Sequence, residues 1–222
     1  MTELPSGVLK EALRLLGVSG EADAELTAEL KGAYETLSAI SRPKWCWKLF
    51  EITVAEDETL LAGSLLLKGA AIAETLRGCG RAAVTAVTLG YETDRYIARL
   101  QREKLSQAVI TDALASAEAE RLCCLCEPEI LEDCGPGAWL TRRFSPGYGG
   151  TELRGSEPLL LALEAEKSMG ITLSSSGLLL PVKSVTAITG IAESPRDRGV
   201  SCGECAAADS CQYRKRGAYC GA

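Results

Sequence analysis

The first forty residues of the chain carry apolar side chains at helical spacing. In residues 9–16, leucine and alanine recur on one helical face, and the pattern stops at Gly17, a residue type that commonly terminates helices. Residues 26–40 repeat apolar positions at intervals of three and four, and this pattern ends before Pro43. The pattern predicts two amphipathic helices.

The following segments combine strands with one long helical pattern. "LFEITV" (49–54) and "AVTAVTLG" (83–90) are typical of β-strands. Residues 93–122 place their apolar side chains on one helical face. Residues 127–156 contain several Gly-Pro, Pro-Gly and Gly-Gly steps, which predict a mostly irregular segment.

Beyond this segment the pattern predicts a helix and then short strands. Ser156 is expected to cap a helix that tolerates proline in its first turn and stops at Gly170. "ITL" (171–173) and "VKSVTAITGIAE" (182–193) predict strands on either side of the turn-like sequence "SSSG".

Helices mixed with strands of this kind predict an α+β fold. From Ser194 onward the chain becomes polar and rich in cysteine. We expect residues 1–194 to form one domain, with helices packed on a mainly antiparallel β-sheet. Residues 195–222 are expected to form a small cysteine-rich C-terminal appendage that binds metal.

The charge of the chain argues against two classes of partner. Lysine and arginine total 24 against 30 aspartate and glutamate, which gives a net charge of −6. An acidic protein of this kind is not expected to bind nucleic acid or an anionic membrane surface. No apolar run approaches the roughly 18–20 residues that span a bilayer, and the acidic start of the chain is unlike a secretory signal. We therefore expect a cytoplasmic protein.

Two residue counts restrict the chemistry. The chain has 10 cysteines and no histidine. The absence of histidine excludes Ser-His-Asp and Cys-His catalysis, histidine-containing zinc sites, and an axial imidazole for a haem or corrinoid. Clustered cysteines in a reducing compartment favour metal binding or redox chemistry.

The loop "RRFSPGYGG" (142–150) carries the second candidate chemistry. Arg143 offers a planar fork of hydrogen-bond donors, and glycines such as Gly147 and Gly149 allow a close approach of the backbone. Tyr148 adds an aromatic face that attracts cations. The loop alone fits either a ligand-binding site or a surface turn with a stacked Arg-Tyr pair.

The residues from Arg143 to Tyr148 resemble the Arg-x-x-Pro-Gly-Tyr signature of the reactivation domain of cobalamin-dependent methionine synthase, which binds S-adenosylmethionine. The likeness extends over residues 112–194. It includes "DALASAEAERL" (112–122), which resembles the helix before the loop, and residues 160–191, which resemble a helix, an Ile-Thr-Leu strand, a serine turn and a final strand.

The resemblance implies a methionine synthase activation-domain-like fold and a ligand site. Arg143 would bind the carboxylate of S-adenosylmethionine, and Tyr148 would lie near its adenine or sulfonium. The remaining binding residues that the resemblance implies are Pro146, Gly147, Gly149, Ser175 and Ser176.

The chain also departs from this family at one position of the pocket. Gly177 stands where the family has a tyrosine after the serine turn, which predicts a wider mouth of the pocket.

The implied function is support of reductive methylation of cob(II)alamin on a partner corrinoid protein, such as methionine synthase. Transfer of a methyl group from a sulfonium to cobalt(I) releases a neutral thioether and requires no proton transfer, so the lack of histidine is no obstacle. The sequence shows no corrinoid-binding module, and the cobalamin would therefore be carried by the partner. The chain would be an accessory component of a methyltransferase in methionine biosynthesis, inactive alone, with a flavodoxin- or ferredoxin-like electron donor.

The tail "CGECAAADSCQYRKRGAYC" contains four thiols within a short span. Cys202, Cys205, Cys211 and Cys220 could bind a [4Fe-4S] cluster, a zinc ion or no metal, because sulfur-only quartets suit all of these states. The need for a low-potential electron favours the iron–sulfur cluster. An alternative function follows, in which the chain is an iron–sulfur or zinc module that activates another corrinoid methyltransferase; a pure docking scaffold is a third.

The other cysteines are expected to be buried thiols rather than metal ligands. Three lie close together at the end of a predicted helix and one follows it, and adjacent residues of a helix point about 100° apart: these are Cys123, Cys124, Cys126 and Cys134. Cys46 and Cys79 are expected in the core. Glu118 and Glu120 either face the corrinoid or are solvated, and solvation is the simpler interpretation.

Overall fold

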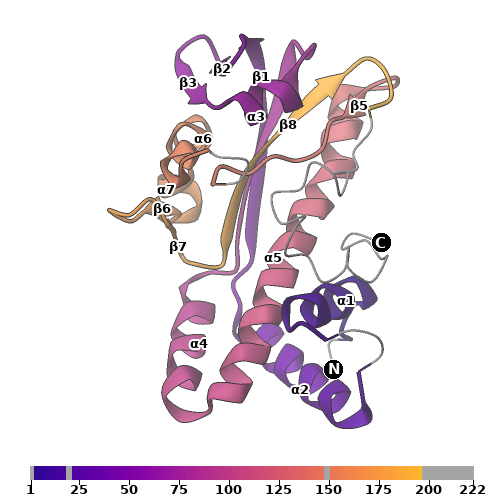
Figure 1. Cartoon of the computed structure of the whole chain (residues 1–222), viewed down its shortest axis with the longest axis vertical. Helices are drawn as coiled ribbons and strands as arrows, with labels where there is room; N and C mark the ends of the chain where they lie inside the picture. The colour runs from indigo at the N-terminus through magenta and orange to yellow at the C-terminus, as the bar shows by residue number, and fades with distance from the viewer. Residues whose placement is uncertain (1–2, 19–21, 148–150, 197–222) are drawn as a thin grey trace.

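The computed structural model describes residues 3–18, 22–147 and 151–196, and it has an α+β fold (Figure 1). Its main sheet has six strands in the order β3-β2-β1-β4-β8-β5, and every neighbouring pair is antiparallel. The strands are β1 Lys44–Val54, β2 Glu58–Leu61, β3 Leu65–Lys68, β4 Arg81–Thr88, β5 Trp139–Leu140 and β8 Ser184–Ala192. A separate hairpin joins β6 Thr172–Leu173 to β7 Leu179–Leu180.

Helices cover both faces of this sheet. Figure 1 shows the long helix α5 on one side of the long strands and α6 and α7 on the other. The hydrophobic core on the α5 side includes α1 and α2, and the second core includes α3, α6 and α7. The helices are α1 Ser6–Leu15, α2 Ala24–Ile40, α3 Ala70–Leu76, α4 Tyr91–Glu103, α5 Leu105–Cys134, α6 Ser156–Leu163 and α7 Ala165–Met169.

Strand β4 lies at the centre of the molecule because both of its faces are covered. Ala83 and Val87 pack in the core on the α5 side, whereas Ala82, Val84 and Ala86 pack in the opposite core. Successive side chains of a strand point to opposite faces, so a strand buried on both faces has a nearly continuous run of apolar residues. This explains why the sequence of β4 shows no alternation of polar and apolar positions.

The structure corrects the predicted helix over residues 93–122. Helix α4 ends at Glu103, and α5 starts at Leu105 and continues through Pro128 to Cys134. A proline inside a helix costs about 3 kcal/mol. Cys126 and Ile130, on either side of Pro128, are both buried in the core on this face. Burial of this helical face explains why the helix continues where the sequence predicted an irregular segment.

The remaining predictions had mixed outcomes. The two N-terminal helices and the predicted strands appear as α1, α2, β1, β4, β6 and β8. Gly170 terminates α7 in the left-handed conformation, but a break at Glu164 separates α6 from α7. Ser156 is not a cap, because its hydroxyl lies 2.9 Å from Thr186 Oγ1 across the core. The sequence pattern did not predict β2, β3, β5, β7 or α3.

Within the described residues, no helix combines the length and apolarity that crossing a bilayer requires. The cysteine-rich appendage lies outside the described residues apart from 195–196.

Candidate functional site

The segment before Pro146 and Gly147 runs alongside strand β8. We call these two residues the proline–glycine loop. The Thr141 amide donates to the Gly190 carbonyl at 2.9 Å, and Phe144 and Ile188 exchange backbone hydrogen bonds of 2.9 and 2.8 Å. Phe144 is buried in the core between the sheet and α6. Arg143 precedes it in the chain and is therefore held between two fixed attachments to β8.

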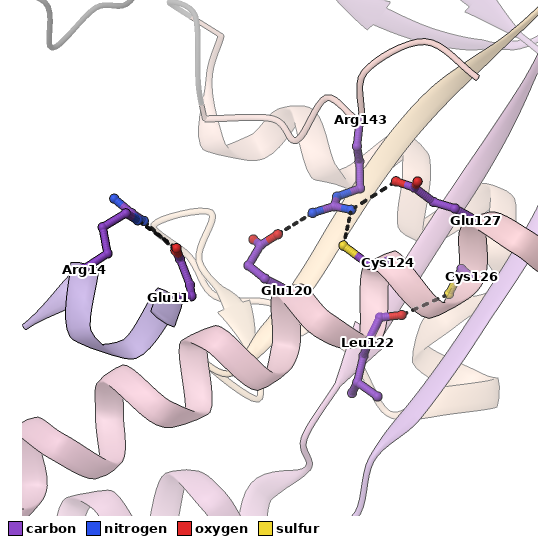
Figure 2. A network of polar contacts seen from close by, with 8 residues as sticks. All are labelled: Glu11, Arg14, Glu120, Leu122, Cys124, Cys126, Glu127 and Arg143. Carbon is purple, nitrogen blue, oxygen red and sulfur yellow. Dashed lines mark hydrogen bonds and ion pairs between the residues drawn. The ribbon is translucent and has the colours of Figure 1, made fainter. Parts of the chain in front are cut away.

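Arg143 lies across three side chains of helix α5, and Figure 2 shows this arrangement, which we call the clamp. Its Nη2 forms an ion pair with Glu120 Oε2. Its Nη1 lies 3.6 Å from Glu127 Oε1 and donates to Cys124 Sγ at 3.8 Å. Residues 120, 124 and 127 are spaced by four and three, so they share one face of the helix. The structure thus places carboxylate, thiol and carboxylate in a row under one guanidinium.

The clamp stabilises the charge of Arg143 although its side chain is only 18% exposed. Burial alone would lower the pKa of Arg143, but the neighbouring Cys123 and Glu120 raise it, and the net direction is upward. The two glutamates carry more negative charge than one guanidinium neutralises. Arg143, the residue that the sequence predicted to bind a carboxylate, is therefore a fixed cation. In this structure its guanidinium is already paired with side chains of α5.

The cysteines of α5 behave differently according to the side they face. Cys123 and Cys126 are buried as predicted, and burial raises the pKa of each thiol to about 12. Such thiols stay protonated at neutral pH and are poor metal ligands. The prediction was wrong for Cys124, which is exposed and contacts Arg143, and Cys134 is half-buried.

The proline–glycine loop is seated on the short 3₁₀ turn η1 (Leu153–Gly155). Gly147 has a φ of +96°, and a Cβ there would lie 2.8 Å from Leu153 Cδ2. A Cβ on Gly155 would lie 3.1 Å from Pro146 Cβ. The Gly147 amide also donates to Thr151 Oγ1 at 2.9 Å. A side chain at either glycine would therefore require neighbouring atoms of the loop or of η1 to shift, and at Gly147 it would also be strained by the positive φ.

The serine turn (residues 174–177) also contacts η1. Gly177 has a φ of +85°, and a Cβ there would lie 3.1 Å from Arg154 N and 3.2 Å from Leu153 Cβ. Arg154 Nη2 donates to the Ser175 carbonyl at 2.9 Å, and Ser176 Oγ lies 2.9 Å from Ser174 Oγ. The space beside Gly177 is thus filled by η1. Pro146, Gly147 and the serine turn are joined through η1, whereas Arg143 contacts α5.

A cleft of about 580 Å³ borders the serine turn on the side of α6 and α7. Its wall includes Ser175, Arg154 and Leu160, and carries the carboxylates of Glu157 and Glu164. The residues that line it include neither Arg143 nor Gly147. The cleft and the clamp are therefore two separate features.

Several of the predicted site residues cannot be placed. Tyr148, Gly149 and the tail quartet of Cys202, Cys205, Cys211 and Cys220 lie outside the described residues. Within residues 3–18, 22–147 and 151–196, no three histidine, cysteine, aspartate or glutamate side chains are arranged to hold a metal ion.

Three further residues settle smaller predictions. Glu118 is not solvated, because its side chain is 13% exposed and it accepts hydrogen bonds from Arg121 and Tyr34. Cys79 is buried as predicted, and Cys46 is half-buried with its Sγ 3.1 Å from Met169 Sδ.

The sequence did not indicate a site role for Cys124 or Glu127, and for Glu120 it allowed either a position facing the corrinoid or, as the simpler interpretation, a solvated one. The spacing of residues 120, 124 and 127 is visible in the sequence. It places them on one helical face only because α5 continues past residue 122, where the predicted helix ended. Their partner, Arg143, is distant in the chain, and only the fold brings it to the helix.

The architecture is that of an antiparallel sheet with helices on both faces, the class predicted from the sequence. The chain is similar to the solved structure described as "Crystal Structure of the MetH Reactivation Domain bound to AdoHcy", with a TM-score of 0.59 and 15% sequence identity. The alignment covers 94% of this chain and 81% of the other. This chain therefore has the fold of the MetH reactivation domain. No protein-family model and no curated protein matches its sequence.

Proposed function

We propose that the chain binds S-adenosylmethionine and supports reductive methylation of cob(II)alamin on a partner corrinoid protein, with methionine synthase as the first candidate. The observation that carries this proposal is the position of the Arg143–Gly147 signature. It lies beside β8, and its Pro146–Gly147 end is joined to the serine turn through η1, within a fold shared with a reactivation domain bound to AdoHcy.

The described residues suit the amino-acid end of such a ligand. Arg143 carries a fixed positive charge, and a hydrogen bond between charged groups contributes about 1.5–3 kcal/mol. Gly147 is exposed at the loop, and its amide already donates to Thr151 Oγ1. We assign Pro146, Tyr148, Gly149, Ser175 and Ser176 to the same site by their likeness to the reactivation domain.

The reaction needs little chemistry from the chain itself. One electron from a flavodoxin- or ferredoxin-like donor reduces cobalt(II) to cobalt(I) on the partner. The cobalt then takes the methyl group as the carbon–sulfur bond breaks, and the sulfonium leaves as a neutral thioether. The role of this chain is to hold the methyl donor in line with the metal, which is catalysis by positioning.

Isothermal titration calorimetry with S-adenosylmethionine tests the binding site. The wild-type chain should bind, and Arg143→Ala should weaken binding by at least about tenfold, or roughly 1.4 kcal/mol. Absence of binding by the wild type, or equal binding by Arg143→Ala, would show that the site is assigned wrongly.

A spectroscopic assay tests the reactivation itself. A corrinoid methionine synthase without its own reactivation domain is mixed with this chain, a strong reductant and S-adenosylmethionine. The cobalt(II) spectrum should change to that of methylcobalt(III), and Arg143→Ala should block the change. The proposal fails if the conversion is equally fast without this chain or without S-adenosylmethionine. The chain alone should turn over nothing.

The tail quartet supports a second proposal, an iron–sulfur or zinc centre with a redox or docking role. Its four cysteines within one short segment are the observation that favours it. Replacement of Cys202 and Cys205 by serine should abolish the metal content while the core stays folded. Metal that persists in this double variant would show that other residues bind it. Metal analysis and the visible spectrum of anaerobically purified protein distinguish a cluster from zinc.

A further inference from the structure

Both ends of the Arg143 guanidinium are already occupied in the structure. Glu120 pairs with Nη2, while Glu127 and Cys124 contact Nη1. A ligand carboxylate that binds arginine in the two-pronged manner needs two adjacent N–H groups. At the edge formed by Nη1 and Nη2 it can therefore bind Arg143 only if one of the α5 side chains moves away.

The two glutamates are unequal in their freedom to move. The Glu120 side chain is 48% exposed, whereas the Glu127 side chain is 21% exposed. Glu120 can therefore turn into water more readily than Glu127 can. Cys124 and Glu127 lie about one and two turns further along α5 and contact the same nitrogen, so they hold the guanidinium from the far side (Figure 2).

We infer that Glu120 is a gate on Arg143. A ligand carboxylate displaces Glu120 from Nη2, while Glu127 and Cys124 keep the guanidinium in its binding position. The inference rests on the proposed function and concerns the regulation of the same site. Because only the fraction of molecules with Glu120 displaced can bind, the gate raises the apparent dissociation constant of the ligand.

Calorimetry with S-adenosylmethionine on the full chain tests the gate through a set of variants. Glu120→Gln should tighten binding by about two- to fivefold, the range that a partly exposed ion pair gives. Glu120→Asp keeps the charge but shortens the side chain, so it should also tighten binding if contact with Arg143 is what matters. Glu127→Gln should weaken binding, because it loosens the anchor. Glu132→Gln, at an exposed position further along α5, is the matched control and should leave the affinity unchanged.

The outcomes separate the gate from the function on which it rests. If the wild type binds and Glu120→Gln binds equally or more weakly, the gate is wrong and the function stands; weaker binding would mean that Glu120 contacts the ligand itself. If Glu127→Gln tightens binding as much as Glu120→Gln, the assignment of gate and anchor is wrong. If neither the wild type nor Glu120→Gln binds, the proposed function fails and the gate fails with it.

Discussion

Helix α5 carries two arginine–glutamate networks on different sides, and they are built in opposite ways. In one, Glu118 accepts hydrogen bonds from Arg121, three residues further along the same helix, and from Tyr34 of α2. In the other, Glu120 pairs with Arg143, which comes from a separate segment of the chain. Residues 118 and 120 are two positions apart, so they point about 200° apart around the helix.

The difference indicates which network can change its partners. The Tyr34 network (Tyr34, Glu118 and Arg121) joins two helices around a Glu118 side chain that is 13% exposed, so its loss leaves polar groups without partners. In the clamp, Glu120 is half-exposed and has water as an alternative partner. We therefore expect the first network to contribute to stability and the second to ligand binding. Four predictions test this comparison, in order of decreasing effect.

The largest effect concerns Cys123, the buried thiol next to the clamp residue Cys124 in the chain. Burial raises the pKa of Cys123 from 9.0 to about 12, so the folded state keeps its proton where the unfolded state loses it. The stability from this thiol is fully present below pH 9 and is lost as the pH rises towards 12. The expected slope is about 1.4 kcal/mol per pH unit, or about 3 kcal/mol by pH 11. Urea unfolding between pH 8 and pH 11 should show this loss in the wild type and a smaller one in Cys123→Ala; equal slopes would contradict the buried thiol.

The second prediction compares the two glutamates directly. Glu118→Gln should lower the free energy of unfolding by about 1.5–3 kcal/mol, because charged hydrogen bonds to Tyr34 and Arg121 are weakened. Glu120→Gln should lower it by less than about 1 kcal/mol, as expected for a partly exposed pair. Urea unfolding at pH 7 measures both, and a larger loss in Glu120→Gln would reverse the assignment.

The third prediction compares the two arginines in ligand binding. Arg121→Ala should change the affinity for S-adenosylmethionine by less than about twofold, because its partners Glu118 and Tyr34 belong to the other network. Arg143→Ala should weaken binding by about 1.4 kcal/mol or more. Equal effects in calorimetry would mean that the two sides of α5 are not functionally distinct.

The smallest effect concerns the Tyr34 hydroxyl. Tyr34→Phe should lower the free energy of unfolding at pH 7 by about 1 kcal/mol through loss of the hydrogen bond to Glu118. Burial, and then the charge of Glu118, raise the pKa of Tyr34 above 10.0. The contribution of a group with a raised pKa is present below its ordinary value and lost as the pH rises, so the deficit of Tyr34→Phe should narrow above pH 10. A deficit that grows with pH would contradict this direction.

Much of the fold was predictable because local patterns determine it. The periodicity of α1 and α2 and the β-branched runs of β1, β4 and β8 were sufficient to predict these elements. The continuation of α5 past Pro128 was not predictable, because it depends on burial of Cys126 and Ile130 in a tertiary core. Strands β2 and β3 are four residues each and are stabilised mainly by pairing with neighbours.

The site was predictable in its residues but not in its contacts. The Arg143–Gly147 signature could be found because its residue order is unusual, whereas the partners of Arg143 depend on the packing of a loop against a helix. Gly177 likewise could be identified from the sequence, whereas its contacts could not. The sequence shows that a tyrosine is absent there, but only the fold shows that Leu153 and Arg154 fill the space.

The seating of the proline–glycine loop and the serine turn on η1 has an evolutionary consequence. Pro146 faces Gly155, Gly147 faces Leu153, and Gly177 faces Arg154, in each case at a separation at which an added Cβ would force neighbouring atoms to shift. A larger residue on one side of such a contact requires a compensating change on the other. In related chains these pairs of positions should therefore be substituted together, and a homologue with a bulky residue in place of Gly177 should have a shorter or displaced η1 turn.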